Sequence, residues 1–298
     1  MLRPRHATTG LLFVAALLAA ACGGGADAPN APTPPPAEAT TRVARTPTPD
    51  CTPARSHAAG VSDEEANGID GAVSFVVHTP ASYDGVAPIP IVLNYHGAGS
   101  TPERQLAYSQ LAVTAEEHGF LLVAPPVGSD TSAVLDHVEA GWCVDAARVF
   151  ATGMSAGARV SSRLACELPD RIAAIAPVAG LDYPTSLCDD VAPRPVVAFH
   201  GSADRVIVMQ GVRDATLAWG RHNGCDPPPI PEPVSARVFL ASYTNCEAGA
   251  DVHLYTVEAG GHTWPGAEPR DGGPLGATTD EISANDLMWA FFEAHPLR

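Results

Sequence analysis

The sequence predicts an α/β fold, in which a mostly parallel central sheet carries helices on both faces. Short, continuous apolar runs recur along the chain, as in strands that are buried on both sides. Segments with helical periodicity alternate with these runs, and that alternation is typical of a parallel sheet between two helical layers. Residues 51–298 suffice for one such domain with a sizeable core, and the sequence shows no internal repeat.

The strands and helices are expected to alternate along this domain. The helix that follows Ser155 should end before Pro169, because proline disfavours helical conformation in the residue that precedes it. The apolar residues of the last helix, with Trp289 and Phe292 among them, should pack in the core. Strands are expected at 72–78, 89–95, 121–124, 148–152, 172–178, 196–199 and 251–257, and helices at 102–118, 132–140, 156–168, 212–222 and 280–294.

The strand expected at 148–152 runs into the motif Gly153-Met-Ser155-Ala-Gly157. A serine on a sharp strand-to-helix turn has a strained backbone and an exposed hydroxyl, and only small neighbours leave room for the turn. The motif alone is weak evidence in a chain with 27 glycines. Its meaning depends on the residues elsewhere in the chain that could activate the serine.

Two further functional groups follow predicted strands. Asp204 lies in a small-residue loop after the strand at 196–199, and His262 lies in a glycine-rich loop after the strand at 251–257. A serine hydroxyl needs a base to accept its proton, and a carboxylate must orient that base. The chain order Ser155, Asp204, His262 is that of the α/β-hydrolase arrangement. We therefore expect these three residues to form a catalytic triad.

An oxyanion hole is expected beside the serine. The strand at 89–95 runs into His96-Gly97-Ala98-Gly99, a loop that can turn a backbone N–H toward a reacting carbonyl. Ala98 would supply one donor and Ala156, directly after the serine, would supply the other. His96 and His200 each precede a functional loop position, so we expect both to be structural.

Five segments, 95–100, 148–157, 173–180, 200–204 and 260–266, resemble the esterase family that includes secreted polyhydroxybutyrate depolymerases, feruloyl esterases and acetylxylan esterases. The resemblance runs from about Gly71 to the C-terminus, and the segment Gly-Gly-His-Thr-Trp-Pro-Gly at 260–266 is its most specific part. It implies an α/β-hydrolase fold with nucleophile Ser155, acid Asp204 and base His262.

The chain departs from this family pattern in two places that concern substrate choice. Arg205-Val-Ile-Val208 stands where the family often has proline and a Val-Pro pair, and the connection between Pro126 and Arg148 is short. A short connection at the carboxyl end of a strand predicts a shallow, open cleft, with Trp264 as a candidate cleft residue. Alternatively, residues 266–279 fold over the site and close it.

Charge and composition exclude several functions. A net charge of −16 argues against nucleic acid as a partner. All 17 basic side chains are arginine, which excludes a Ser-Lys dyad, a Schiff-base lysine and a phosphate-loop lysine. The sequence has neither His-Glu-x-x-His nor paired Cys-x-x-Cys. We therefore expect no metal and no cofactor.

The N-terminus has the features of an exported protein. Residues 1–21 read as an export signal, whose apolar stretch is too short to span a bilayer. Cys22 follows three alanines in a sequence similar to a lipobox, so lipidation is expected, with ordinary cleavage as the alternative. Residues 22–50 are rich in Pro, Ala and Thr and read as a disordered tether. The product would be a cell-envelope lipoprotein or an extracellular enzyme, bound to a membrane only through a lipid.

Six cysteines remain besides Cys22, which implies three disulfides in an exported protein. Cys225 and Cys246 are the first expected pair. For the other four, our first choice joins Cys143 to Cys166 and Cys51 to Cys188, and the alternative joins Cys166 to Cys188 and Cys51 to Cys143. A nucleophilic thiol is disfavoured, because the sequence places no cysteine on a strand-to-helix turn.

The predicted function is that of a serine carboxylic-ester hydrolase with an acyl-enzyme intermediate. Its substrate would be an ester, either a polyester such as polyhydroxybutyrate or an acyl ester of plant polysaccharide. Two alternatives stay open: a surface lipoprotein that uses the scaffold only for binding, and an amidase or peptidase. The fold does not choose the substrate, since many chemistries share it.

Overall fold

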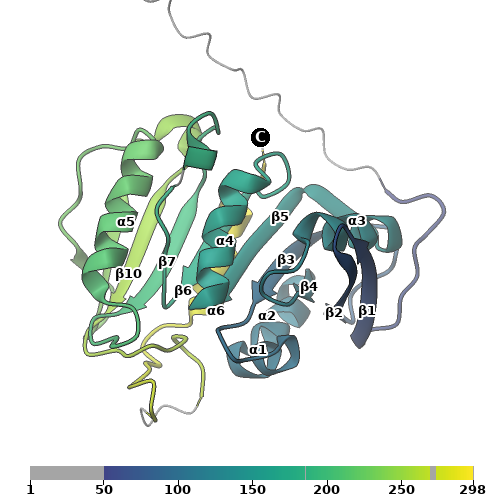
Figure 1. Ribbon diagram of the computed structural model, residues 1–298, viewed down its shortest axis with the longest axis horizontal. Helices are drawn as coiled ribbons and strands as arrows, with labels where there is room; N and C mark the ends of the chain where they lie inside the picture. The colour runs from purple at the N-terminus through teal and green to yellow at the C-terminus, as the bar shows by residue number, and fades with distance from the viewer. Residues whose placement is uncertain (1–49, 185, 269–272, 298) are drawn as a thin grey trace, which may run out of the picture. The chain divides into compact units, whose positions relative to one another are not determined.

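The computed structural model describes residues 50–184, 186–268 and 273–297 (Figure 1). The predicted export signal, Cys22 and residues 22–49 of the predicted tether lie outside the described residues. No helix in these described ranges is long and apolar enough to cross a membrane.

The central sheet has ten strands in the order β1-β2-β4-β3-β5-β6-β7-β10-β9-β8. The six strands from β4 to β10 in this order run parallel, and the strands outside them pair antiparallel. The predicted α/β-hydrolase class with a mostly parallel sheet is confirmed. The strands are β1 (Gly60–Gly68), β2 (Gly71–Thr79), β3 (Ile89–Tyr95), β4 (Leu121–Ala124), β5 (Val144–Met154), β6 (Ala174–Val178), β7 (Val196–Gly201), β8 (Glu232–Pro233), β9 (Val238–Tyr243) and β10 (Val252–Val257).

Helices cover both faces of the sheet, as Figure 1 shows. Apolar side chains of α3, α4 and α5 pack on one face, and those of α2 and α6 pack on the other. The two faces thus form two separate apolar clusters, which is the three-layer arrangement expected for a sheet buried on both sides. The helices are α1 (Pro102–Ser109), α2 (Leu111–His118), α3 (Thr131–Gly141), α4 (Ala156–Glu167), α5 (Met209–His222) and α6 (Ala284–Ala294), with short 3₁₀ turns at Ser186–Cys188 and Glu247–Gly249.

The structure differs from the expected elements mainly at the edges of the sheet. Strands β1, β8 and β9 lie outside the expected set. Of these, β1 and β8 are edge elements whose mostly exposed or half-buried residues form no continuous apolar run, whereas β9 is an inner strand that begins with the apolar run 238–241. The helix expected at 102–118 is two helices, because Gln110 adopts a left-handed conformation with φ 54° between α1 and α2. The last helix begins at Ala284, where the Ser283 side chain caps the N–H of Asp286.

The three disulfides join Cys51 to Cys143, Cys166 to Cys188 and Cys225 to Cys246. The expected Cys225–Cys246 pair is confirmed. Our first choice for the other four cysteines is wrong, and the alternative pairing is the one observed. Cys143 precedes β5 on the side where β3 begins, whereas Cys166 at the end of α4 faces the 3₁₀ turn that ends at Cys188.

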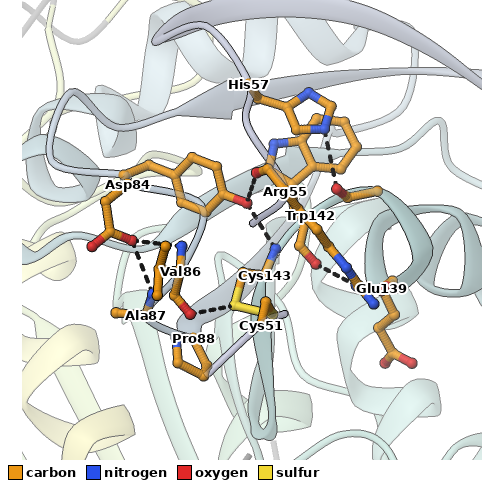
Figure 2. The surroundings of a disulfide bond; sticks show 12 residues. Cys51, Arg55, His57, Asp84, Val86, Ala87, Pro88, Glu139, Trp142 and Cys143 are labelled. Carbon is orange, nitrogen blue, oxygen red and sulfur yellow. Dashed lines mark hydrogen bonds between the residues drawn. A yellow bond between two sulfur atoms is a disulfide. The ribbon is translucent and has the colours of Figure 1, made fainter. Parts of the chain in front are cut away.

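The position of Cys51 explains this pairing. The backbone N–H of Cys51 donates to the Val86 carbonyl at 2.9 Å, so the first described residues run beside the segment that enters β3. The Arg55 guanidinium donates to the Trp142 carbonyl at 2.9 Å, and the His57 ring stacks on the Trp142 indole with ring centroids 3.8 Å apart (Figure 2). These contacts hold Cys51 beside Cys143 and away from Cys188.

Candidate active site

Ser155 lies on the turn between β5 and α4. Its backbone has φ 57° and ψ −111°, a strained conformation for a residue with a side chain. A Cβ on Gly153 would lie 2.6 Å from the Tyr95 carbonyl oxygen, and a Cβ on Gly157 would collide with the same oxygen. Both glycines of the motif are therefore required by the close approach of β3. The structure shows the sharp strand-to-helix turn that the sequence predicted.

The sheet register brings the three predicted triad residues to one edge. Parallel strands β5, β6, β7 and β10 are consecutive neighbours, and the backbone N–H of Ser155 donates to the Val178 carbonyl at 3.0 Å. Residues Val178 and Phe199 are paired, as are Gly201 and Val257. The loops that follow these strands consequently share the carboxyl edge of the sheet, where this class of fold places its ligands.

Asp204 is the carboxylate that contacts the histidine. Its Oδ2 lies 2.7 Å from Nδ1 of His262, and only 6% of the residue is exposed. Its Oδ1 accepts hydrogen bonds from the backbone N–H groups of Val206 and Ile207 at 2.8 and 2.9 Å. Both oxygens are thus held in place, and one is aimed at the imidazole.

The two other acids that stand near in the sequence have different partners. The Asp182 carboxylate lies 3.5 Å from the Arg159 guanidinium, and the Asp214 carboxylate accepts a hydrogen bond from Gln210. Of these three acids, Asp204 is therefore the one placed to orient His262.

His262 is 4% exposed and sits in a loop that only glycines allow. A Cβ on Gly261 would collide with the Leu275 carbonyl oxygen, to which the His262 backbone N–H donates at 2.7 Å. Because the Asp204 carboxylate accepts from Nδ1, that nitrogen carries a proton, and the neutral ring held in this orientation has its lone pair on Nε2. This tautomer is the one a general base needs.

The loop after β3 lies against the serine. A Cβ on Gly97 would be 3.5 Å from the Ser155 Cβ, so Ala98 follows a residue that touches the nucleophile turn. Ala156 is the first residue of α4, where backbone N–H groups have no partner within the helix. Gly97, the residue before Ala98, and Ala156 therefore lie beside Ser155, and the oxyanion role of Ala98 and Ala156 stays a prediction.

His96 and His200 hold their own loops, as expected. The His96 Nδ1 donates to the Gly97 carbonyl at 2.8 Å, and its Nε2 accepts from the Val127 N–H at 3.2 Å. The His200 Nε2 donates to the Ile207 carbonyl at 2.9 Å and lies 3.6 Å from the Asp204 Oδ2. Burial lowers the pKa of His200, so this ring stays neutral next to the acid.

Trp264 does not line a cleft, and its prediction as a cleft residue is wrong. The side chain is fully buried, and its Nε1 donates to the Asn285 Oδ1 at 2.8 Å. Its backbone N–H donates to the Tyr108 hydroxyl at 3.2 Å. The loop turns inward after His262, so the indole packs between α1 and α6 instead of facing substrate.

This burial reveals a polar network that the sequence did not indicate. Asn285 donates to the Ser109 carbonyl at 2.9 Å, and Asn94 at the end of β3 donates to the Ser109 hydroxyl at 3.0 Å. The network therefore connects the loop of the histidine to the strand that delivers the oxyanion loop. The amide within the apolar run 89–95 was the one available signal, since a buried amide needs polar partners.

The segment after Gly273 packs against the histidine loop. Its carbonyl groups at Leu275 and Ala277 accept from the His262 and Gly261 N–H groups, both within 2.8 Å. A cavity of about 320 Å³ remains between this segment and the loop of Asp204, with Arg205 and Val206 among its walls. Residues 273–279 thus pack against the loop of His262, and both the open cleft and its closed alternative stay predictions.

The described residues hold no group of three or more His, Cys, Asp or Glu side chains that could bind a metal ion. This edge of the sheet brings together a serine on a strained turn, an imidazole and a carboxylate. That set matches the requirements of nucleophilic acyl transfer.

Comparison with known proteins finds similar esterases. Models of protein families find no match. The putative esterase NocK from Nocardia uniformis subsp. tsuyamanensis is 28% identical over 95% of this chain and 97% of its own length. Feruloyl esterase B from Piromyces equi is 25% identical over 63% of this chain, which spans 42% of that relative. The chain is therefore similar to a curated esterase over nearly its whole length.

A solved structure supports the fold of this esterase. The acetyl xylan esterase from Aspergillus awamori matches with a TM-score of 0.59 and 16% identity, over 78% of this chain and 98% of that one. The chain therefore has a fold similar to that of this solved esterase, and its similarity to curated esterases supports the hydrolysis of carboxylic esters.

Proposed function

We propose that Ser155, His262 and Asp204 form the catalytic triad of a serine esterase that removes acyl groups from plant polysaccharide. The observation that carries this proposal is the 2.7 Å contact between Asp204 Oδ2 and His262 Nδ1 at the same sheet edge as the strained Ser155 turn. The non-catalytic alternative needs neither feature, and a strained serine is costly to keep without a role.

The reaction proceeds in two steps. The Ser155 Oγ attacks the ester carbonyl while His262 Nε2 takes its proton, and the backbone N–H groups of Ala98 and Ala156 stabilise the resulting oxyanion. The imidazolium then protonates the leaving alcohol, and the acyl group stays on Ser155. Water, deprotonated by the same histidine, attacks the acyl-enzyme and releases the acid.

The names of the relatives favour an acyl ester of polysaccharide over a polyester. The similar proteins include feruloyl esterase B and an acetyl xylan esterase. We therefore propose a feruloyl or acetyl ester as substrate, with polyhydroxybutyrate as the rival that an assay must test. An amidase or peptidase has less support, because the similar proteins named here are esterases.

Export is supported by the three disulfides, which form and persist in oxidising compartments. We propose that residues 1–21 are removed on export and that Cys22 carries the lipid, with the residues up to 50 as tether. Mass spectrometry of the mature protein checks this, because a diacylated Cys22 at the N-terminus and an unmodified N-terminus differ in mass.

Phosphonate labelling tests the nucleophile. One adduct is expected on the peptide that contains Ser155, and Ser155→Ala should lose both the adduct and hydrolysis of p-nitrophenyl acetate. Ser161→Ala is the matched control, since the Ser161 hydroxyl donates to the Ala158 carbonyl within α4. Retained hydrolysis in Ser155→Ala would refute the triad.

A substrate panel tests the acyl group. Methyl ferulate, acetylated xylan and polyhydroxybutyrate are offered to the same preparation, and release of ferulate or acetate is expected to exceed release of hydroxybutyrate. A preference for polyhydroxybutyrate would reassign the substrate while leaving the triad in place.

A further inference from the structure

A second cavity, of about 560 Å³, lies on the flank of the sheet between α5 and the strands β9 and β10. Its volume is within the range of small-molecule binding sites, roughly 300 to 1,000 Å³. None of its described lining residues belongs to the proposed triad. The walls that matter here are Arg213 and Asp214 of α5, Phe239 and Tyr243 of β9, and the prolines Pro228 and Pro229 of the loop that follows α5.

Tyr243 supplies a fixed ring with a free hydroxyl. The residue is 8% exposed, and its ring lies on Gly220 of α5, where a Cβ would approach Tyr243 Cδ1 to 2.7 Å. Burial raises the pKa of Tyr243, so the hydroxyl stays protonated. This hydroxyl has no hydrogen-bond partner among the described residues, and its oxygen is not fully buried. It is therefore open to the cavity.

The mouth of the cavity carries two opposite charges. Arg213 and Asp214 are both exposed, and the Arg213 guanidinium has no ion-pair partner in the described part of the chain. Asp214 accepts one bond from Gln210 at Oδ1 and keeps its second oxygen for another donor. The pair offers several donors and acceptors without net charge.

This combination fits a neutral, polyhydroxylated ring. The Phe239 ring and the proline rings present flat apolar faces, on which the C–H face of a sugar can pack, while the charged pair and the Tyr243 hydroxyl can bind its hydroxyls. An anionic ligand would be attracted by Arg213 but repelled by the neighbouring Asp214 carboxylate. A cationic ligand would be attracted by Asp214 but repelled by Arg213.

The cavity lies beside β10, whose continuation carries the base, and beside α5, which follows the loop of the acid. Helix α5 begins five residues after Asp204, so Arg213 and Asp214 are about 6 to 8 Å along the helix from its start at Met209. Thr256 of the cavity wall is the penultimate residue of β10, whose continuation carries His262. Val206 and Val208, in the segment between Asp204 and α5, are both exposed.

We propose that this cavity binds a neutral sugar unit of the polysaccharide whose ester is cleaved at Ser155. The polymer would then lie along the start of α5, held at the cavity, while the acyl group reaches the triad. This inference rests on the proposed function, since it assumes a polysaccharide substrate.

Titration calorimetry with xylohexaose, a neutral oligosaccharide without an ester, tests the cavity directly. The Ser155→Ala protein is expected to bind it, and adding Arg213→Ala and Asp214→Ala should weaken binding about tenfold or more, as the loss of charged hydrogen bonds does. Tyr243→Phe keeps the ring on Gly220 and should weaken binding by a smaller factor. Arg221→Ala, an exposed arginine in the last turn of the same helix, should leave binding unchanged.

Kinetics with Ser155 intact give the second readout. The Arg213/Asp214 variant should lose about tenfold in kcat/KM on feruloylated or acetylated xylan and keep its rate on p-nitrophenyl acetate. Failure of native protein to bind millimolar xylohexaose, or equal binding by the variant, would overturn the cavity proposal. An equal fall on both ester substrates would also overturn it. Failure of the triad shows separately, as p-nitrophenyl acetate hydrolysis that survives Ser155→Ala.

Discussion

The two edges of the parallel sheet differ in the interactions that fix their loops: non-covalent contacts at the carboxyl edge and disulfides at the amino edge. At the carboxyl edge, Ser155, Asp204 and His262 lie in loops fixed by hydrogen bonds, close glycine contacts and strained backbone. At the amino edge, where the strands begin, Cys143 precedes β5 and Cys188 precedes β7. That edge is held by covalent bonds, because each of the three disulfides includes a cysteine that shortly precedes a parallel strand.

Residues other than glycine with positive φ occur at both edges, since Asn245 and Ala248 beside Cys246 have φ 53° and 54° at the amino edge. Ser155 and Ala179 follow the ends of β5 and β6 directly, and Ala259 follows shortly after β10; all three have positive φ. Such residues cost of order 1–3 kcal/mol each and persist only where the surrounding structure holds them. The disulfides at the opposite edge add stability without occupying the edge that must stay open to a substrate.

The largest expected effect belongs to the carboxyl edge. Asp204→Asn should lower kcat about 10⁴-fold, because the amide no longer selects the histidine tautomer with a free Nε2. Circular dichroism should show an intact fold. Asp182→Asn, which alters an exposed pair with Arg159, is the matched control and should keep its activity. Loss in the control instead of in Asp204→Asn would reassign the acid.

Removing a disulfide at the amino edge should lower the stability of the fold without lowering the catalytic rate. Replacing both Cys166 and Cys188 by serine opens a loop with a sequence separation of 22 residues and should cost about 2–5 kcal/mol of unfolding free energy. Denaturant unfolding measures this loss, and kcat on p-nitrophenyl acetate under native conditions should not change. A fall in kcat would show that the two edges are coupled.

The buried amide network should give an intermediate effect that reaches the active site. Asn285→Ala removes the partners of Trp264 and Ser109, and an unpaired buried group costs about 1–3 kcal/mol. Because Trp264 follows His262 by two residues, kcat should fall while KM changes little.

Two comparison variants sharpen the Asn285 prediction. Asn285→Asp keeps an acceptor for the Trp264 indole and should recover part of the lost kcat, whereas Asn67→Ala on the exposed edge strand β1 should have no effect. A loss of unfolding free energy in Asn285→Ala with unchanged kcat would mean that the network stabilises the fold alone.

The smallest effect is expected at an exposed ion pair of the carboxyl edge. Glu281 has its pKa lowered to about 2, first by the Ser235 hydroxyl and then by Arg237. A lowered carboxyl pKa stabilises the folded state above the unfolded value near 4.5, and this contribution is lost as the pH falls toward 2. The difference in Tm between native protein and Glu281→Gln should therefore shrink over this pH range. A constant difference would contradict the assignment.

The sequence by itself determined the features that depend on local order. Continuous apolar runs marked the parallel strands, and the spacing of Gly153, Ser155 and Gly157 marked a sharp turn that the structure shows with φ 57° at the serine. The position of Asp204 and His262 after consecutive buried strands was enough to predict their contact, because parallel strands end at a common edge.

The tertiary structure decided what depends on which segments become neighbours. Cys51 could pair with Cys143 only because the chain before β1 runs beside the entry to β3, which no local pattern reveals. Trp264 appeared beside the base in sequence, yet packing between α1 and α6 buries it, with Asn285 as its partner. A local sequence pattern predicts which face of a helix or strand is apolar. Which segment packs on that face depends on the tertiary structure.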